Sequence, residues 1–207
     1  MRSDRSAGSD RSVGSSLPLR PSGGYRRLRS FQVTTIIYDA TVSFCDRFVD
    51  RRSRTRDQMI QAARSGRQNI AEGSRASATS SQTEIRLVSV ARSSLDELLL
   101  DYEDYLRQNG KRAWTKDDPE SLAVRAVGRR KDPTDPPDPT DRSDLSQPYS
   151  SWLQDSDPGV VANAIICLIH QANYLLDHQV LSLERDFIEG GGYRENLAAA
   201  RRARRSF

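Results

Sequence analysis

The residues with the clearest chemical potential are arginines that cluster near one point of the chain and continue beyond it. A guanidinium group binds phosphate oxygens well but does not by itself read base sequence. The cluster and its continuation comprise Arg51, Arg52, Arg54, Arg56, Arg64, Arg67 and Arg75. If Arg64 and Arg67 point outward from a helix, they form one stripe with Arg56. The pattern therefore predicts nucleic-acid phosphate contacts by Arg54, Arg56, Arg64 and Arg67.

Both ends of the chain are also basic, whereas the remainder carries a net negative charge. Residues 1–29 contain seven Arg and two Asp, and residues 190–207 contain five Arg and one Glu. Basic terminal segments attract polyanions such as RNA and DNA. We therefore expect the C-terminal arginines to add phosphate contacts; these are Arg201, Arg202, Arg204 and Arg205.

Ion pairing offers a different explanation for the same arginines. Residues 30–108 contain eleven Arg and eleven acidic residues. These arginines could therefore all form ion pairs within or between subunits. Residues 151–189 contain one Arg and six acidic residues. Such an acidic segment could bind a protein partner instead. The charge pattern leaves two function classes open: a nucleic-acid-binding scaffold, or a protein-assembly module that binds no nucleic acid.

The carboxylates Glu72 and Glu84 flank a predicted turn, and paired carboxylates can perform acid–base chemistry. The sequence places no nucleophile or substrate-positioning group beside them. It contains neither a Gly-x-Ser-x-Gly elbow nor a phosphate-binding glycine loop followed by Lys-Ser. We expect Glu72 to accept hydrogen bonds that fix the turn. The sequence predicts no catalytic residues and a protein that is not an enzyme.

Metal-ligating residue types are few and poorly spaced. His170 and His178 are the only histidines, and eight helical residues span about 12 Å, too far for one metal ion. Cys45 and Cys167 lie in apolar helical segments, which favours buried, reduced thiols. We therefore expect no metal site and no cofactor.

Four segments with apolar residues at helical spacing would position these side chains. The first begins near Ser30, the second runs from a cap at Thr55 to a stop at Gly73, and the third covers Ser80–Gln108. The fourth follows Asp157-Pro158 and ends at Gly190. Their apolar faces include Val33, Ile37, Ala40, Phe44, Phe48, Met59, Ala63, Gly66, Ile70, Val88, Ala91, Leu95, Leu98, Tyr102, Tyr105, Val161, Ile165, Leu168 and Ala172.

This periodicity predicts an all-α fold, an up-down-up-down four-helix bundle over residues 30–189. Asn69 adjoins the apolar face of the second helix, where a lone amide often fixes register or oligomeric state. Residues 1–29 form a disordered basic tail by composition, and residues 190–207 form a basic C-terminal suffix. That suffix has good helix formers and could become helical on binding.

Residues 109–150 interrupt the helical pattern and hold six of the nine prolines. Their Pro/Asp-rich composition predicts a flexible acidic insert outside the core, with a short helix over Pro119–Gly128. Trp114 and Trp152 flank the insert and are expected to dock its ends on the helices, with stacking on nucleic-acid bases as the alternative. No apolar run approaches the ~20 residues that span a membrane, and the N-terminus lacks a secretory pattern. These features predict a soluble, cytoplasmic protein without membrane contact.

Two stretches resemble a known family: GRQNIAEGS at residues 66–74 and SSQTEIRLVSVARSSLDELLLDYEDYLRQ at residues 80–108. They look like the small bacterial four-helix-bundle proteins encoded in intervening sequences of ribosomal RNA genes, or the accessory variability determinant of diversity-generating retroelements. The resemblance is most specific at Asn69, Ile70, Glu72 and Gly73, and the C-terminus resembles a suffix found in one branch. It implies a homo-oligomer, commonly a pentameric ring, without known catalytic activity.

The retroelement member of that family binds a reverse transcriptase and nucleic acid through basic surface. The resemblance and the basic tails together predict a non-enzymatic oligomeric scaffold that binds RNA or DNA and presents it to a protein partner. The alternative remains a protein–protein assembly module whose working surface is acidic.

Overall fold

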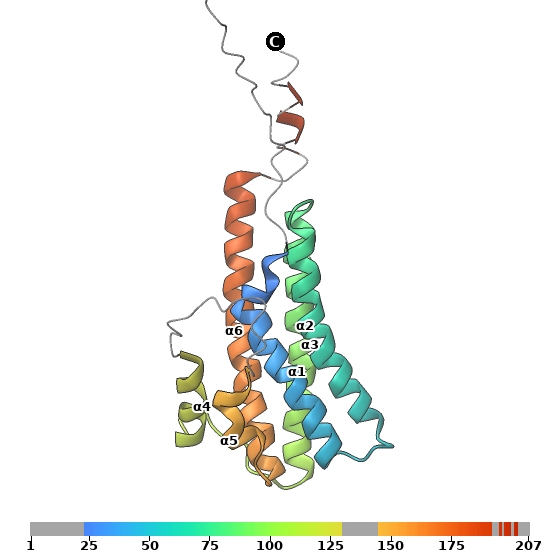
Figure 1. Ribbon diagram of the computed structural model, residues 1–207, viewed down its shortest axis with the longest axis vertical. Coiled ribbons are helices and arrows are strands. Elements are labelled where there is room, and N and C mark those ends of the chain that lie inside the picture. The colour runs from blue at the N-terminus through green and yellow to red at the C-terminus, as the bar shows by residue number, and fades with distance from the viewer. Residues whose placement is uncertain (1–22, 130–144, 192–194, 196, 200, 203–207) are drawn as a thin grey trace, which may run out of the picture.

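In the computed structural model, the described residues are 23–129, 145–191, 195, 197–199 and 201–202 (Figure 1). Within these ranges the regular structure is entirely helical, and no strand occurs. The predicted all-α class is therefore confirmed. The predicted disorder of residues 1–22 and the Pro/Asp-rich run at 133–144 lie outside the described residues, as do Arg204 and Arg205.

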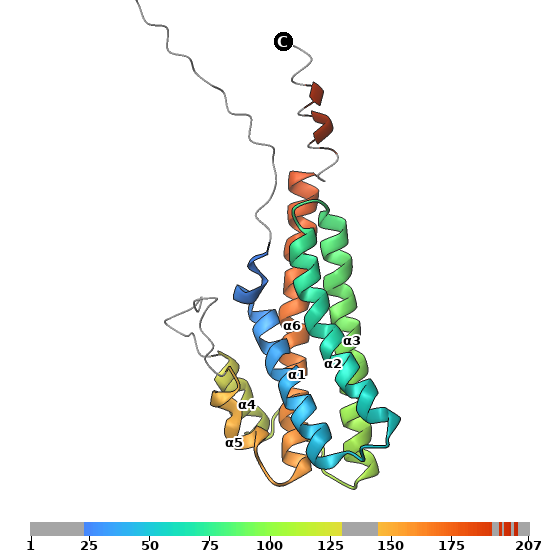
Figure 2. The ribbon, with the colours of Figure 1, turned by 45° about the vertical axis from the view of Figure 1, so that its right-hand side comes forward.

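Four long helices dominate the fold: α1 (Arg29–Phe48), α2 (Arg54–Ala76), α3 (Ser81–Gln108) and α6 (Pro158–Gly190). Helix α2 packs against α1 and α3, and α6 packs against the other sides of α1 and α3. Figures 1 and 2 show the four helices side by side along the long axis of the molecule. Each helix thus has two long neighbours against which to bury an apolar stripe.

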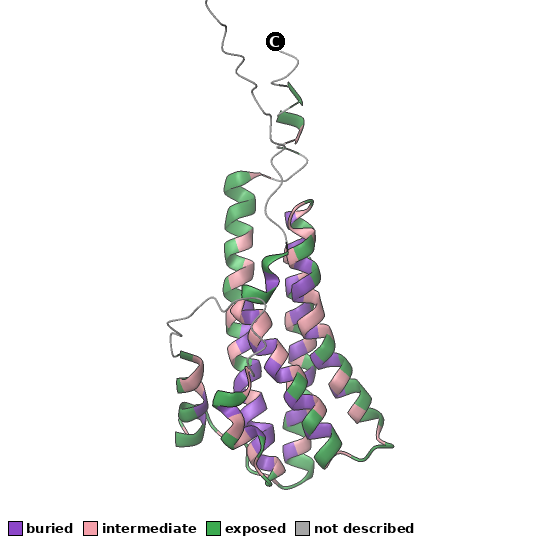
Figure 3. Cartoon of the chain, in the orientation of Figure 1, coloured by how far each residue is buried: buried purple, intermediate pink, exposed green. Residues whose placement is uncertain are grey.

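The predicted apolar faces meet in the space between these helices. Ile37, Phe44, Ile70, Leu98 and Ile165 are fully buried. Figure 3 shows the buried residues on the inward sides of the four long helices. Phe48 and Tyr105 are only partly buried, although both predicted stripes included them. They lie at the rim of an aromatic group around Phe44.

Both ends of α2 differ from the expected boundaries. The N-cap is Ser53, not Thr55, and the helix continues to Ala76, so Gly73 lies inside the helix and does not stop it. Helices tolerate an interior glycine when packing requires it. Ser80 is the N-cap of α3, and its hydroxyl oxygen accepts a hydrogen bond from the Thr83 N–H at 3.1 Å.

The segment 23–28 is ordered, which corrects the prediction of disorder for this end of residues 1–29. A 3₁₀ helix, η1 (Gly24–Arg27), places Tyr25 in a buried position. The Tyr25 ring packs edge-on against Phe31 at a centroid distance of 4.8 Å. The Gly23 N–H also donates to the Ser74 carbonyl of α2 at 3.4 Å. One aromatic side chain therefore docks a segment whose composition is otherwise typical of disorder.

Part of the insert also belongs to the core, against expectation. Helix α4 (Pro119–Arg129) closely matches the predicted short helix, but it packs on α6 and buries Val124. A 3₁₀ turn, η2 (Gln147–Tyr149), leads into the short α5 (Ser150–Leu153), which also packs on α6. A few apolar residues are enough to pack these elements on α6. The overall Pro/Asp-rich composition of the insert did not indicate that they would do so.

Helix α6 is longer than its neighbour α1. The Ser30 hydroxyl donates to the Gln179 side-chain carbonyl at 2.8 Å, so α1 begins beside the middle of α6. Figures 1 and 2 show the remainder of α6 continuing past that point. By length and composition, α6 could cross a membrane, contrary to the expectation that no run is long enough. However, 67% of its most apolar stretch is buried within the protein, as in a core helix.

Candidate nucleic-acid interface

Three arginines of η1 and α2 lie over tyrosine rings on the side of the molecule where η1, α1 and α2 meet. The Arg67 guanidinium lies 4.3 Å from the Tyr38 ring centroid. Arg26 and Arg75 lie 5.2 and 5.1 Å from the Tyr25 ring centroid. The Arg75 Nη2 also donates to the Tyr25 hydroxyl at 3.2 Å. Such cation–π contacts orient a guanidinium without neutralising its charge.

Arg64 extends this group along α2. Residues 64, 67 and 75 fall on one side of an α-helix because their spacings of three and eight approximate whole turns. Arg64 is exposed, as are Arg26 and Arg75. We call these four residues, Arg26, Arg64, Arg67 and Arg75, the arginine face. Within the described part of the chain, none of the four forms an ion pair.

Arg54 and Arg56, which the sequence grouped with Arg64 and Arg67, lie in acidic surroundings. Arg56 Nη2 is 2.5 Å from Asp46 Oδ1, and its Nη1 is 3.6 Å from Asp57 Oδ1. The hydrogen bond to Asp46 raises the pKa of Arg56. Arg54 lines a groove between α2 and α3 together with Asp57, Glu97 and Asp101. The expected single stripe therefore separates into an ion-paired part and the arginine face.

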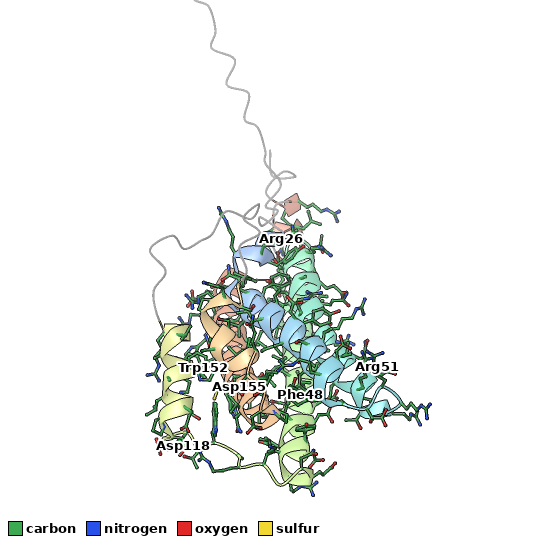
Figure 4. All side chains as sticks on the ribbon, turned by 60° about the horizontal axis from the view of Figure 1, so that its bottom comes forward. Arg26, Phe48, Arg51, Asp118, Trp152 and Asp155 are labelled. Carbon is green, nitrogen blue, oxygen red and sulfur yellow. The ribbon has the colours of Figure 1, made fainter. Side chains whose placement is uncertain are left out.

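The remaining predicted arginines lie elsewhere. Arg201 and Arg202 are exposed within helical residues near the C-terminus. Arg51 and Arg52 are exposed at the turn between α1 and α2, where Figure 4 shows Arg51 far from Arg26. The structure thus does not bring all the predicted phosphate contacts into one surface.

The residues expected to fix turns and register have other environments. The Asn69 side chain is half-buried and donates to the Ser65 carbonyl of its own helix at 2.9 Å. The Glu72 side chain is exposed and has no hydrogen bond among the described residues. Gly73 is buried at the contact between α2 and α3, where an added Cβ would lie 3.4 Å from the Glu84 carbonyl oxygen.

Sequence reasoning missed a buried amide that anchors the segment after α3. Asn163 of α6 is 2% exposed. Its side-chain oxygen accepts from the Trp114 N–H at 2.8 Å, and its Nδ2 donates to the Arg112 and Gly159 carbonyls at 2.9 and 2.8 Å. The sequence does contain one indication of this anchor, since Asn163 is a polar residue inside the apolar run of α6. Beside it, Lys111 Nζ pairs with Asp157 Oδ1 at 3.0 Å.

A second missed amide belongs to a polar cluster between α3 and α6. Asn173 Nδ2 donates to Asp96 Oδ1 at 2.7 Å, while Arg92 bridges Asp96 at 2.8 Å and Asp177 at 2.6 Å. One guanidinium group bridges two carboxylates on different helices, so this cluster joins α3 and α6. It has no reactive arrangement.

The described residues contain no group of three or more His, Cys, Asp or Glu that could hold a metal ion. His178 packs against the Tyr174 ring at 4.4 Å. Both cysteines are buried free thiols, as predicted. Burial raises the pKa of the Cys45 thiol to about 11 and also raises that of Cys167. Thiols held protonated in this way are poor nucleophiles near neutral pH.

Comparison of the chain with protein-family models, curated proteins and solved structures finds no match.

Proposed function

We propose that the protein is a non-enzymatic scaffold that binds the phosphate backbone of RNA or DNA through the arginine face. The observation that carries this proposal is the alignment of Arg26, Arg64, Arg67 and Arg75, which have no carboxylate partner among the residues that the structure describes. Two tyrosine rings orient three of these guanidinium groups. A preorganised cation loses less conformational entropy on binding phosphate than a freely moving side chain does.

The resemblance to the bacterial four-helix-bundle family supports the same proposal. We take the four long helices as the up-down-up-down bundle that the resemblance implies. In a homo-oligomer, such as a ring of five subunits, each copy would repeat the arginine face. Several weak phosphate sites on one particle bind a long strand far more tightly than a single copy does. A protein partner would then receive the bound strand.

Replacing Arg64, Arg67 and Arg75 together by Gln is expected to weaken binding to duplex DNA about tenfold or more at moderate salt. Each phosphate contact contributes roughly 0.9 to the slope of log K against log salt, so the slope should fall by about 2–3 per bound subunit. Fluorescence anisotropy with labelled DNA and RNA, measured over a salt series, gives both quantities. A second variant, with Gln at Arg201, Arg202, Arg204 and Arg205, tests the C-terminal arginines.

The matched control replaces Arg51, Arg52 and Arg86 by Gln, which removes the same charge from exposed positions outside the arginine face. This control should bind nearly as tightly as the unmodified chain. An equal loss in both triple variants would show that only net charge matters. No measurable affinity at low salt for the unmodified chain would refute the proposed function altogether.

The exposed apolar residues of α6 favour the second candidate function, protein–protein assembly. Tyr174, Leu181 and Ile188 are 63%, 56% and 81% exposed and recur every seven residues. A seven-residue repeat presents one side of a helix to a partner. Asp177, Glu184 and Asp186 lie between them in the sequence, and Glu189 follows Ile188. This surface could join subunits or bind a basic protein.

Replacing Leu181 and Ile188 by Gln is expected to shift the protein from an oligomer to a monomer in light scattering coupled to size-exclusion chromatography. Removing two exposed apolar contacts per subunit weakens an interface but should leave the core unchanged. Leu122→Gln provides a control on α4, since Leu122 is 46% exposed. A monomeric unmodified chain at every concentration, or an unchanged mass for the variant, would contradict assembly through α6.

A further inference from the structure

A cavity of about 730 Å³ lies between α4 and α6, away from the arginine face. Its walls come from the start of α1, the segment after α3, α4 and the middle of α6. Pockets that bind small organic ligands typically enclose about 300–1,000 Å³. The cavity exists because α4 packs on α6, so it is formed by the insert that the sequence placed outside the core.

The lining of this cavity is strongly cationic. The described residues that line it include Arg29, Lys116, Arg125 and Arg129, together with the His170 imidazole, and none of these described lining residues carries a carboxylate. The Arg125 Nη1 donates to the Lys116 carbonyl at 2.8 Å, and the Arg29 Nη2 donates to the Gly128 carbonyl at 3.0 Å. The hydrogen bond to a neutral carbonyl fixes the Arg125 guanidinium group without cancelling its charge. A site with this field favours an anion.

The rest of the lining favours a planar, partly apolar group. Trp114 and Tyr174 supply two aromatic side chains, and Ile166 and Leu175 are partly buried apolar residues beside them. The Asn163 hydrogen bond to the Trp114 N–H fixes the backbone that carries the indole ring. Aromatic side chains stack on nucleobases regardless of base identity. The cavity thus combines cations for phosphate with rings for a base.

We propose that the α4–α6 cavity binds a nucleoside phosphate, with the phosphate near Lys116 and Arg125, which lie side by side, and the base against Trp114. The ligand could be a free mononucleotide or the terminal nucleotide of a strand, because both offer the same chemistry. Binding of a free nucleotide does not depend on the arginine face, whereas binding of a strand end rests on the proposed function. Comparing free nucleotides with oligonucleotides distinguishes the two sources.

The test uses the intrinsic fluorescence of Trp114 in the full chain carrying Trp152→Phe, which leaves Trp114 as the single tryptophan. The probes are the four ribonucleoside 5′-monophosphates, with adenosine and inorganic phosphate as fragments. We expect each mononucleotide to quench Trp114 saturably and to bind at least about tenfold more tightly than either fragment. That ratio corresponds to about 1.4 kcal/mol. Equilibrium dialysis of the unmodified chain provides the same affinities without the Trp152 substitution.

Lys116→Gln combined with Arg125→Gln should weaken mononucleotide binding about tenfold or more, because the two substitutions remove both cations beside the phosphate. Arg86→Gln with Arg51→Gln, the matched control, should leave it unchanged. The Arg64, Arg67 and Arg75 triple variant should also keep mononucleotide affinity, so this proposal and the proposed function can fail separately. A strand end is the source if oligonucleotides with a 5′-phosphate bind more tightly than those with a 5′-hydroxyl and free nucleotides compete.

Two results would overturn the proposal. The first is the absence of mononucleotide binding by both fluorescence and dialysis. The second is mononucleotide binding that Lys116→Gln with Arg125→Gln leaves unchanged, or that the control variant weakens as much as this double variant does. In either case the cavity would be a structural gap between α4 and α6 without a nucleotide function.

Discussion

Asn163→Ala is expected to lower the free energy of unfolding by about 3 kcal/mol, since each buried polar group that loses its partner costs roughly 1–3 kcal/mol. The substitution removes the acceptor of the Trp114 N–H and the donor to the Arg112 carbonyl. It also removes the side chain that anchors the segment after α3 to α6. Urea unfolding followed by circular dichroism measures the loss, and hydrogen exchange at residues 111–115 should accelerate.

Asn163→Asp tests the donor and acceptor roles of the Asn163 side chain separately, because it keeps the acceptor and removes the donor. A carboxylate still accepts from the Trp114 N–H, but it faces the Arg112 and Gly159 carbonyl oxygens without a donor. We expect a loss at least as large as that of Asn163→Ala near neutral pH. Asn109→Ala is the control, because Asn109 is exposed and donates one hydrogen bond, to the Tyr105 carbonyl. Equal losses at positions 109 and 163 would show that the buried network contributes nothing specific.

Gly66→Ala is expected to destabilise the protein by about 1–3 kcal/mol, the usual cost of overpacking a core, although alanine favours helix more than glycine does. An added Cβ would lie 2.9 Å from Leu95 Cδ2 and 3.1 Å from Leu95 Cγ. Leu95 is fully buried, so its side chain has little space into which to move. The unfolding midpoint in urea, at an unchanged slope, is the appropriate measurement.

Gly73→Ala tests the same change on the same helix at a looser contact. There the new Cβ would lie 3.4 Å from the Glu84 oxygen and Leu87 Cβ and 3.7 Å from Val88 Cγ2. Stability should stay within about 1 kcal/mol or rise, since helix propensity favours alanine. In a Leu95→Ala background, Gly66→Ala should lose most of its cost. An additive double variant would rule out the Leu95 contact as the cause.

The long helices could be predicted because their apolar residues repeat at helical spacing over many turns. Phe44, Leu98 and Ile165 are buried where that repeat placed them. Helix ends were harder to predict, because Gly73 suits a helix stop and also a close helix contact. Only the position of α3, which lies across from Gly73, distinguishes these two uses.

The candidate site depended on facts that the sequence does not contain. Arg56 and Arg67 look equivalent in the sequence, yet one meets Asp46 and the other meets Tyr38. Both partners belong to α1. The rotation of α2 about its axis relative to α1 determines which arginine contacts which residue. In the sequence, Asn69 resembles a structural amide because it adjoins a sparse apolar face. Asn163 has that role because α6 faces the backbone of a segment about fifty residues earlier in the chain.

The order of the helices along the chain has a consequence for how the protein folds. Helices α2 and α3 are joined by a short turn and can form a hairpin early, whereas α6 must return from beyond the insert to meet α1. Contacts between distant segments form late because closing a long loop costs entropy. We therefore expect docking of α6 to be the step that completes the core. Because the same step would form the α4–α6 cavity, we expect a ligand of that cavity to act on the last stage of folding and to slow the first stage of unfolding.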